Sequence, residues 1–382
     1  MLSSPKGYRK PIDEHKIDEF ALEVMHDLDA TAHCALAYIG DKLGLYKAMA
    51  KAEDKGITSR ELANITSTNE RYIRDWLAEQ ASKHYVFYDP STGKYTLPEE
   101  HAAVLADENS HNYLAGGFQL LVSILRQQPK IAQAFCTGEG FEWGDHDNGV
   151  FEGQARLNSN QYRANLTDKW ISSLMDVEDK LRSPKGAKVA DIGCGYGVST
   201  IIMAKAYANS SFIGVDNHAR SIKVARKSAK EQGLDNEDRL RFITARAETF
   251  PKDDGYDLVT FFDCFHDMGN PFAVARHVKD VLKPKGTLML VETTSSDKLE
   301  ENIESPVGTN GYAGSILICL PTAFAQMKKS AKFAKTDCEV VDLPLGGMPG
   351  ANSIESLLRT CGFTKFRCAL KNNFNMVLEA RP

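Results

Sequence analysis

The alternation of short apolar runs with helical segments between residues 187 and 293 constrains the fold most strongly. We expect five buried strands at "AKVADIG", "SFIGVD", "LRFITA", "YDLVTFFDC" and "TLMLVET". Helices are predicted between them at about 198–208, 220–232 and 271–282, the last followed by the stop-and-turn signal "KPKG". Because strands joined by helical crossovers form a parallel sheet covered on both faces, this part of the chain is predicted to be an α/β domain.

The tail departs from that repeat. In "FTKFRCALKNNFNMVLEARP", two β-rich runs flank Asn372 and Asn373, a pair that tolerates positive φ in a tight turn. We therefore predict a hairpin whose last strand, at about 375–379, closes the sheet in the antiparallel direction.

The first strand runs into the turn of "VADIGCGYGVST", with Asp191 followed by Gly193, Gly195 and Gly197. The dinucleotide fingerprint G-x-G-x-x-G requires a glycine at position 198, where this chain has Val198. The G-K-[ST] sequence of a phosphate-binding loop is also absent. The turn therefore favours a ligand without a phosphate group.

Asp216 ends the second strand, 23 residues after Gly193. A carboxylate at that place can accept both hydroxyls of a ribose, in NAD-binding folds as in others, so it indicates a nucleoside without identifying it. A carboxylate at Asp191 would repel a pyrophosphate and favour a cationic amino-acid group. Together with the terminal hairpin, these features favour S-adenosylmethionine as the cofactor and disfavour a nicotinamide dinucleotide.

Residues 187–293 resemble the class I S-adenosylmethionine-dependent methyltransferases through "VADIGCGYG", "IGVD", "ARAETFP" and "LKPKGTLMLVE". The resemblance implies a Rossmann-like seven-stranded sheet with an antiparallel last strand. Members of that family often place an acid against the adenine amino group where this chain has Arg246, so we expect the Ala247 backbone to make that contact. The residues predicted for the cofactor site are Asp191, Gly193, Cys194, Gly195, Asp216, Asn217, Ala247, Glu248, Asp263 and Cys264.

The segment "FFDCFHDMGNP" places His266 and Asp267 just beyond the fourth strand, at the sheet edge where α/β proteins bind ligands. Methyl transfer to oxygen or nitrogen commonly requires the loss of a proton, and a histidine with a pKa near ~6.5 is suited to remove it. A neighbouring carboxylate could hold its tautomer. His266 and Asp267 are the predicted catalytic residues, with a wall of the cofactor pocket as the other role for His266.

The His-Asp pair resembles the "HD" of the winged-helix small-molecule O-methyltransferases, in which the histidine is the general base. Met268 stands where those enzymes usually have a tryptophan. The resemblance implies a small-molecule acceptor, with oxygen as the expected acceptor atom. No metal is expected at the site.

An apolar insertion at 301–350, with the helical run "PVGTNGYAGSILICLPTAFAQ", is predicted either to roof a substrate cleft or to form a plain core or dimer helix. Its candidate functional residues are Tyr312, Gly346 and Gly347. His111, Tyr113 and Phe118, on the helices predicted ahead of the sheet, are further candidates for the same cleft.

The first hundred residues predict a winged helix, with helix starts near Thr58 and at Thr68 or Asn69 and a hairpin at "YVFYDPSTGKYTL". A transcription regulator that senses the cofactor is therefore the alternative function. These residues hold 13 Lys and Arg against 17 Asp and Glu, a net charge of −4, whereas DNA binding requires a basic face. In the O-methyltransferases that the chain resembles this module mediates dimerisation, so we expect a homodimer and no nucleic-acid partner.

We predict three regions: a winged-helix domain at 1–105, a helical linker at 106–185 and an S-adenosylmethionine-binding domain at 186–382. The eight cysteines include no C-x-x-C pair, and the start of the chain lacks an apolar signal segment. No later run is long and apolar enough to span a bilayer. The chain is therefore expected to be cytoplasmic, without a membrane partner.

Overall fold

The computed structural model describes residues 12–234, 236–330 and 344–382. The chain divides into two compact units, Met1–Asp107 and Glu108–Pro382. Most of the segment that the sequence suggested as a separate linker therefore lies in the second unit. Residues 331–343 of the predicted insertion are outside the described residues.

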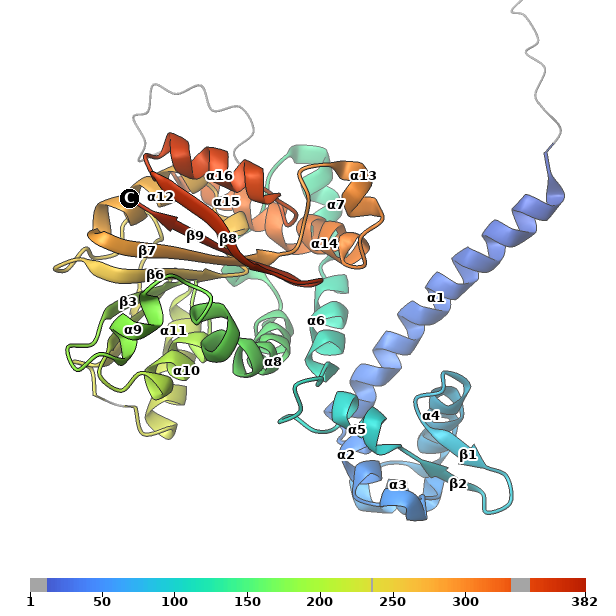
Figure 1. Ribbon diagram of the computed structural model, residues 1–382. Coiled ribbons are helices and arrows are strands. Elements are labelled where there is room, and N and C mark those ends of the chain that lie inside the picture. The colour runs from blue at the N-terminus through green and yellow to red at the C-terminus, as the bar shows by residue number, and fades with distance from the viewer. Residues whose placement is uncertain (1–11, 235, 331–343) are drawn as a thin grey trace, which may run out of the picture. The chain divides into compact units, whose positions relative to one another are not determined.

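The first unit has the winged-helix arrangement that the sequence predicted (Figure 1). Thr58 begins the third helix with a capping box in which its hydroxyl and the Glu61 carboxylate bond each other's backbone amides, and Asn69 caps the fourth. The elements are α1 Glu14–Lys42, α2 Leu45–Ala50, η1 Glu53–Lys55, α3 Ser59–Thr66, α4 Glu70–Ser82, β1 Phe87–Asp89, β2 Lys94–Thr96 and α5 Glu99–Leu105.

The second unit is built on a seven-stranded sheet. Its strands are β3 Lys188–Ile192, β4 Ser211–Asp216, β5 Leu240–Thr244, β6 Tyr256–Phe262, β7 Leu282–Thr293, β8 Lys365–Lys371 and β9 Asn375–Arg381. They lie in the order β5-β4-β3-β6-β7-β9-β8, with the first five parallel and β9 antiparallel to both β7 and β8. The predicted sheet and its antiparallel terminal strand are confirmed.

One boundary differs from the prediction. The segment "KPKG" at 283–286, expected as a turn before the strand, lies inside β7, which pairs with β6 from Leu282 onward. A register shift between Tyr256 and Leu258 accommodates the irregular start, and Lys283 Nζ donates to Asp257 Oδ2 over 2.6 Å. Tertiary pairing thus extends a strand through local turn residues.

Helices cover both faces of this sheet. The helices of the unit are α6 Ala115–Leu125, α7 Gln128–Thr137, η2 Trp143–Asp145, α8 Asn148–Asn165, η3 Leu166–Ile171 (a π-helical turn), α9 Val177–Arg182, α10 Val198–Ala206, α11 Ala219–Glu231, η4 Phe265–Asp267, α12 Pro271–Val281, α13 Leu299–Ile303, α14 Gly308–Gly314, η5 Ser315–Cys319 (π-helical), α15 Leu320–Ser330 and α16 Ala351–Thr360. One core cluster packs α9, α10 and α11 on one face, and the other packs α12 and α16 on the opposite face (Figure 1).

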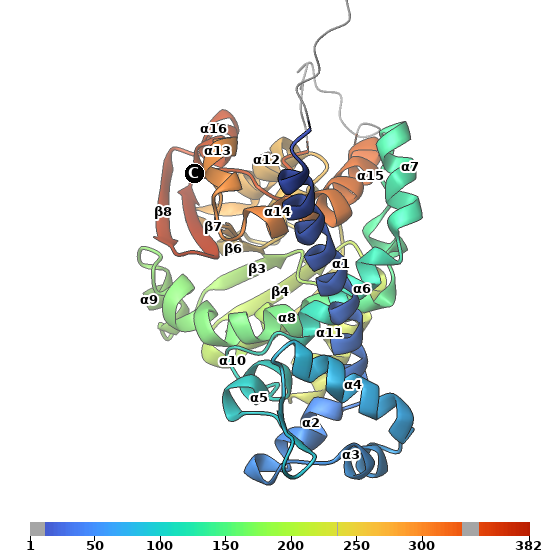
Figure 2. The ribbon, with the colours of Figure 1, turned by 90° about the vertical axis from the view of Figure 1, so that its right-hand side faces the viewer.

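The insertion and the helices that precede the sheet meet at the carboxyl ends of the strands. Helix α7 lies beside α15 in both views (Figures 1 and 2), and Lys328 forms an ion pair with Glu139 there. Parallel α/β sheets place their ligand sites at this edge.

Candidate active site

A cavity of about 700 Å³ opens at the carboxyl ends of β3, β4, β5, β6 and β7. Of the twelve predicted site residues, all but Asp191 line it. The insertion also lines it, through residues that include Leu317, Ile318 and Cys319, which agrees with the predicted roof over the cleft.

The glycine turn after β3 presents bare backbone to this cavity. Gly193, Gly195 and Gly197 have φ values of 70°, 52° and 77°, in the left-handed region that side chains with a Cβ rarely adopt. A Cβ at Gly193 would also lie 2.6 Å from Cys264 Sγ. The turn therefore forms a surface on which a ligand can lie directly against the main chain.

Asp216, at the end of β4, is fixed by two backbone amides. Its Oδ2 accepts from Gly195 N–H over 2.9 Å and its Oδ1 accepts from His218 N–H over 2.8 Å. Burial raises the pKa of this carboxyl, and the two hydrogen bonds oppose that shift. Since each carboxylate oxygen has two lone pairs, both can accept a further bond from a ligand in the cavity, next to Asn217.

Asp191 lies behind the turn rather than against a ligand, which differs from the sequence-based expectation. Its Oδ2 accepts from the hydroxyls of Ser199 and Thr200 at 2.6 Å each, and its Oδ1 accepts from Thr260 at 3.0 Å. Burial raises its pKa to about 6 against these bonds. Ser199 and Thr200 lie in the first turn of α10, directly after the glycines. Their hydrogen bonds hold the Asp191 carboxylate behind the glycine turn, where it stabilises the turn.

The turn after β5 bears the expected residues. Arg246, Ala247 and Glu248 all line the cavity, and Arg246 Nη2 donates to Glu248 Oε1 over 3.0 Å. Arg246, which stands where the resembling family often has an acid, is thus ion-paired with Glu248. Ala247, between these two residues, lines the cavity.

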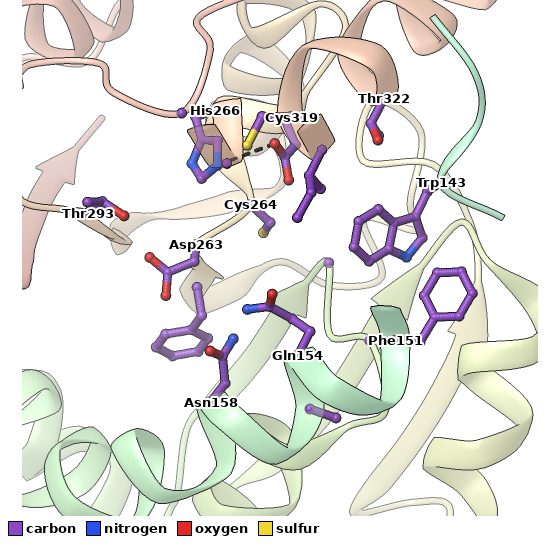
Figure 3. A pocket seen from close by; sticks show the side chains of 18 of the residues that line it. Trp143, Phe151, Gln154, Asn158, Asp263, Cys264, His266, Thr293, Cys319 and Thr322 are labelled. Carbon is purple, nitrogen blue, oxygen red and sulfur yellow. Dashed lines mark ion pairs between the residues drawn. The ribbon is translucent and has the colours of Figure 1, made fainter. Parts of the chain in front are cut away.

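An aromatic wall next to the β4 turn was not predicted. Trp143 and Phe151 line the cavity (Figure 3), their ring centres are 5.3 Å apart, and Phe151 lies 4.8 Å from the ring of His218. Trp143 begins η2, within the region 106–185 that the sequence predicted only as a helical linker. Burial lowers the pKa of His146 in that segment to about 4, and this ring lies 3.4 Å from the Thr322 hydroxyl of α15.

His266 is buried and is held by a carboxylate that sequence analysis missed. Its Nδ1 hydrogen-bonds Oε2 of Glu292, at the end of β7, while Oε1 of Glu292 accepts from Phe265 N–H over 3.1 Å. Burial lowers the pKa of His266, but the charges of Glu292 and Asp267 outweigh it and hold the pKa well above 6.5. Glu292 is the last residue but one of the run "TLMLVET", where a charged residue in a buried strand was the available signal.

The sequence suggested that Asp267 fixes the tautomer of His266, but Glu292 is the carboxylate on Nδ1. Oδ1 of Asp267 lies 3.3 Å from Nε2 of His266, on the other side of the ring, and has no hydrogen-bond partner among the described residues. The ligand atoms of His266, Asp267 and Cys319 all lie within 4.8 Å of one another. The partner of Nδ1 is therefore Glu292, which comes from the neighbouring strand β7, whereas Asp267 faces Nε2.

Asp263 and Cys264 follow β6 directly and line the cavity (Figure 3). Burial raises the pKa of the Cys264 thiol and of the nearby Cys194 thiol well above 9, so both are protonated at neutral pH. Gly347 is also in the lining, whereas Gly346, Tyr312, His111, Tyr113 and Phe118 are not among the lining residues of the described structure.

These residues fit a nucleoside with an amino-acid tail. The bare turn, the ribose-type carboxylate, the aromatic wall and the buried His266 all border a single cavity. Arg246, the only Lys or Arg side chain in the described lining, is paired with Glu248 and so offers no phosphate site.

Comparison with known proteins agrees with this geometry. Residues 183–338 match a family described as a methyltransferase domain, and residues 31–107 match an Rv2258c-like winged HTH domain. Over 178 residues the chain is 28% identical to the ubiquinone biosynthesis O-methyltransferase of Actinobacillus pleuropneumoniae, covering 46% of this chain and 73% of the relative.

Solved structures share the whole fold. An O-methyltransferase family protein from Burkholderia thailandensis has a TM-score of 0.67 at 14% identity, covering 94% of this chain and 97% of its own. Human N-acetylserotonin methyltransferase, solved in complex with S-adenosylmethionine, has a TM-score of 0.63 at 15% identity, covering 98% and 99%. Taken with the site geometry, these matches identify the chain as an S-adenosylmethionine-dependent methyltransferase with a winged-helix domain ahead of its methyltransferase domain.

Proposed function

We propose that the chain transfers a methyl group to an oxygen atom of a small molecule, and that His266 removes the proton from the acceptor hydroxyl. The observation that carries this proposal is the buried hydrogen bond from His266 Nδ1 to Glu292 beside the cavity. A carboxylate on Nδ1 fixes that nitrogen as the donor, so Nε2 is the proton acceptor in the neutral form of the ring.

The roles of the chain's own groups follow from their positions. The glycine turn and Asp216 bind the nucleoside and its tail, and Asp191 keeps the turn in shape from behind. S-adenosylmethionine, when bound, supplies an activated methyl group. Nε2 of His266 takes the acceptor proton, and Glu292 stabilises the imidazolium that forms.

The test is a set of acceptors that differ in the reacting atom. We expect labelled S-adenosylmethionine to methylate phenols and other aryl alcohols, with the label found on oxygen by mass spectrometry and NMR. Matched aryl amines, aryl thiols and aryl carboxylic acids without an alcohol or phenol group should react at least about tenfold more slowly, because the site is arranged to deprotonate an alcohol or phenol. A label found on nitrogen, sulfur or carbon would contradict the oxygen assignment.

The charges of the winged-helix unit do not favour the regulator alternative. On α4, the helix that would enter a DNA groove, Arg74 is paired with Glu70 and Arg71 with Asp75. Both arginines are thus neutralised on their own helix, and a basic face for phosphates is not formed there.

We propose that α1 instead mediates homodimerisation. Ile17, Phe20, Val24 and Leu28 recur at helical spacing on α1, and 41–65% of each residue is exposed. We expect light scattering to show a dimer, and the double substitution Phe20→Glu and Leu28→Glu to give a monomer. Glu19→Gln on the same helix is the control, and a monomeric unsubstituted chain would contradict the proposal.

We also retain the cytoplasmic location as a proposal, from the spread of unpaired thiols. Among the helices of the described residues, none has both the length and the apolar character needed to cross a membrane.

A further inference from the structure

The cavity carries an excess of acidic groups at the end where His266 lies. Apart from Asp216 and the Arg246–Glu248 pair on the nucleoside side, the Asp, Glu, Lys, Arg and His side chains of the described lining are Asp263, His266 and Asp267. Glu292, buried directly behind His266, adds a third carboxylate. One histidine cannot balance three carboxylates, so this end of the cavity is suited to a positive charge.

Asp263 is the member of this group without an assigned partner. His266 engages Glu292 on one nitrogen and lies 3.3 Å from Asp267 on the other. By contrast, Oδ1 of Asp263 is buried with no hydrogen-bond partner among the described residues. Leaving a carboxylate oxygen desolvated and unbonded is unfavourable, and a donor from a ligand would remove that cost.

The backbone holds Asp263 in this position against its own preference. Its φ is 49°, in the left-handed region that costs an ordinary residue roughly 1–2 kcal/mol. Its N–H donates to Val291 O on β7 over 2.8 Å, which ties the residue to the neighbouring strand. Strained residues of this kind often occur where a side chain is aimed at a ligand, and Asp263 lines the cavity, where Figure 3 shows it below Thr293 and His266.

The environment of Asp263 also makes it responsive to a cation. Burial, and then the charge of Glu292, raise its pKa to about 7, while His266 opposes the shift. A cationic group bound next to it would favour the ionised carboxylate and gain a charge-assisted hydrogen bond.

We propose that the methyl acceptor carries a basic nitrogen in addition to its hydroxyl, and that Asp263 is the counter-ion for that nitrogen. The proposal rests on the small-molecule methyltransferase function given above. The insertion adds the apolar side chains of Leu317 and Ile318 to the lining, so the ligand class is a hydroxylated aryl amine or a comparable organic cation. Acids and phosphates are excluded because no free Lys or Arg faces them within the described lining.

Binding to the protein loaded with S-adenosylhomocysteine tests this. The probes are phenol, naphthol and hydroxyindole rings that each carry an aminoethyl, an ethyl or a carboxyethyl chain, titrated by calorimetry. We expect the aminoethyl compounds to bind at least about tenfold more tightly than the ethyl compounds, and the carboxyethyl compounds to bind most weakly, as charge complementarity requires. Asp263→Asn should reduce the aminoethyl affinities to those of the ethyl compounds, and Asp254→Asn, on the exposed turn before β6, should leave them unchanged.

The sulfonium of the cofactor is the other cation that Asp263 could serve. In that case Asp263→Asn would weaken the binding of S-adenosylmethionine but not of the uncharged-sulfur S-adenosylhomocysteine, and this result would overturn the proposal. Equal affinities for all three side chains, or tightest binding of the acids, would also overturn it. Failure of the methyltransferase function itself is distinguishable, because S-adenosylhomocysteine would then not bind to the unsubstituted chain.

Discussion

His266→Gln is expected to lower kcat for methyl transfer by roughly 10²–10⁴-fold, the range typical of the loss of a general base. Glutamine retains a hydrogen-bonding group near Glu292 but cannot accept a proton from a hydroxyl. Binding of S-adenosylhomocysteine, measured by calorimetry, should stay unchanged, because the proposed nucleoside-binding groups are the glycine turn and Asp216 rather than His266. The measurement uses the acceptor that reacts fastest in the set described above.

His277→Gln is the matched control. His277 is on α12, outside the cavity lining, where its Nε2 bonds the Phe250 carbonyl over 2.8 Å. If His266→Gln retains a rate within about threefold of the unsubstituted chain, the general-base role, which predicts a much larger loss, is wrong.

The same histidine predicts a pH dependence with a defined sign. His266 is active as a base only when Nε2 has no proton, and the charges of Glu292 and Asp267 hold its pKa well above 6.5 against the effect of burial. Activity should therefore fall as pH drops through that raised pKa. Glu292→Gln removes one of these charges, so the fall should move to lower pH, with a lower plateau rate because the imidazolium loses its stabilising carboxylate. An unmoved pH profile would show that Glu292 does not act on the titrating group.

Asp216→Ala is expected to weaken S-adenosylhomocysteine binding by roughly 10²–10⁴-fold. Each hydrogen bond from a ribose hydroxyl to a charged carboxylate contributes about 1.5–3 kcal/mol, and Asp216 can accept two. NAD should bind to neither protein, because the site offers no groups for a pyrophosphate. Calorimetric titration with both ligands measures this directly.

The control for this substitution has to separate affinity from folding, because Asp216 also accepts the Gly195 and His218 amides. Asp238→Asn, on an exposed turn, should bind the ligand normally. Asp216→Asn preserves size and part of the hydrogen bonding, so it should melt close to the unsubstituted chain yet still bind weakly. Normal affinity in a folded Asp216→Asn protein would remove Asp216 from the cofactor site.

The elements that the sequence predicted well are those in which local pattern and tertiary structure agree. The strands β3 to β6, the helices α10 to α12 and the terminal hairpin all lie within a few residues of their predicted places. Each combines a buried apolar run with strong turn or cap residues, such as Gly233 after α11 and Pro271 at the start of α12. The residues on strand ends that line the cavity could also be named in advance, because a parallel sheet brings those ends to one edge.

The errors concern residues whose role depends on a distant partner. Asp191 was expected at the ligand, but the hydroxyls of Ser199, Thr200 and Thr260 take its carboxylate inward. Asp267 was expected to orient His266, but Glu292, 26 residues further along the chain, is the group on Nδ1. Trp143, in the predicted helical linker and not among the candidate site residues, forms part of the cavity wall.

The sequence by itself thus determined the fold class, the sheet edge at which the cavity opens and the placement of His266 at that edge. These follow from periodicity, glycine placement and strand ends, which are local properties of the chain. Only the tertiary structure decided that Glu292 fixes His266, that Asp191 stabilises the glycine turn and that Asp263 lines the cavity with an unbonded oxygen. Those assignments depend on the direction of each side chain after β6 and β7 pair in register, and a hydrogen bond between neighbouring strands leaves no trace in the spacing of residues along the sequence.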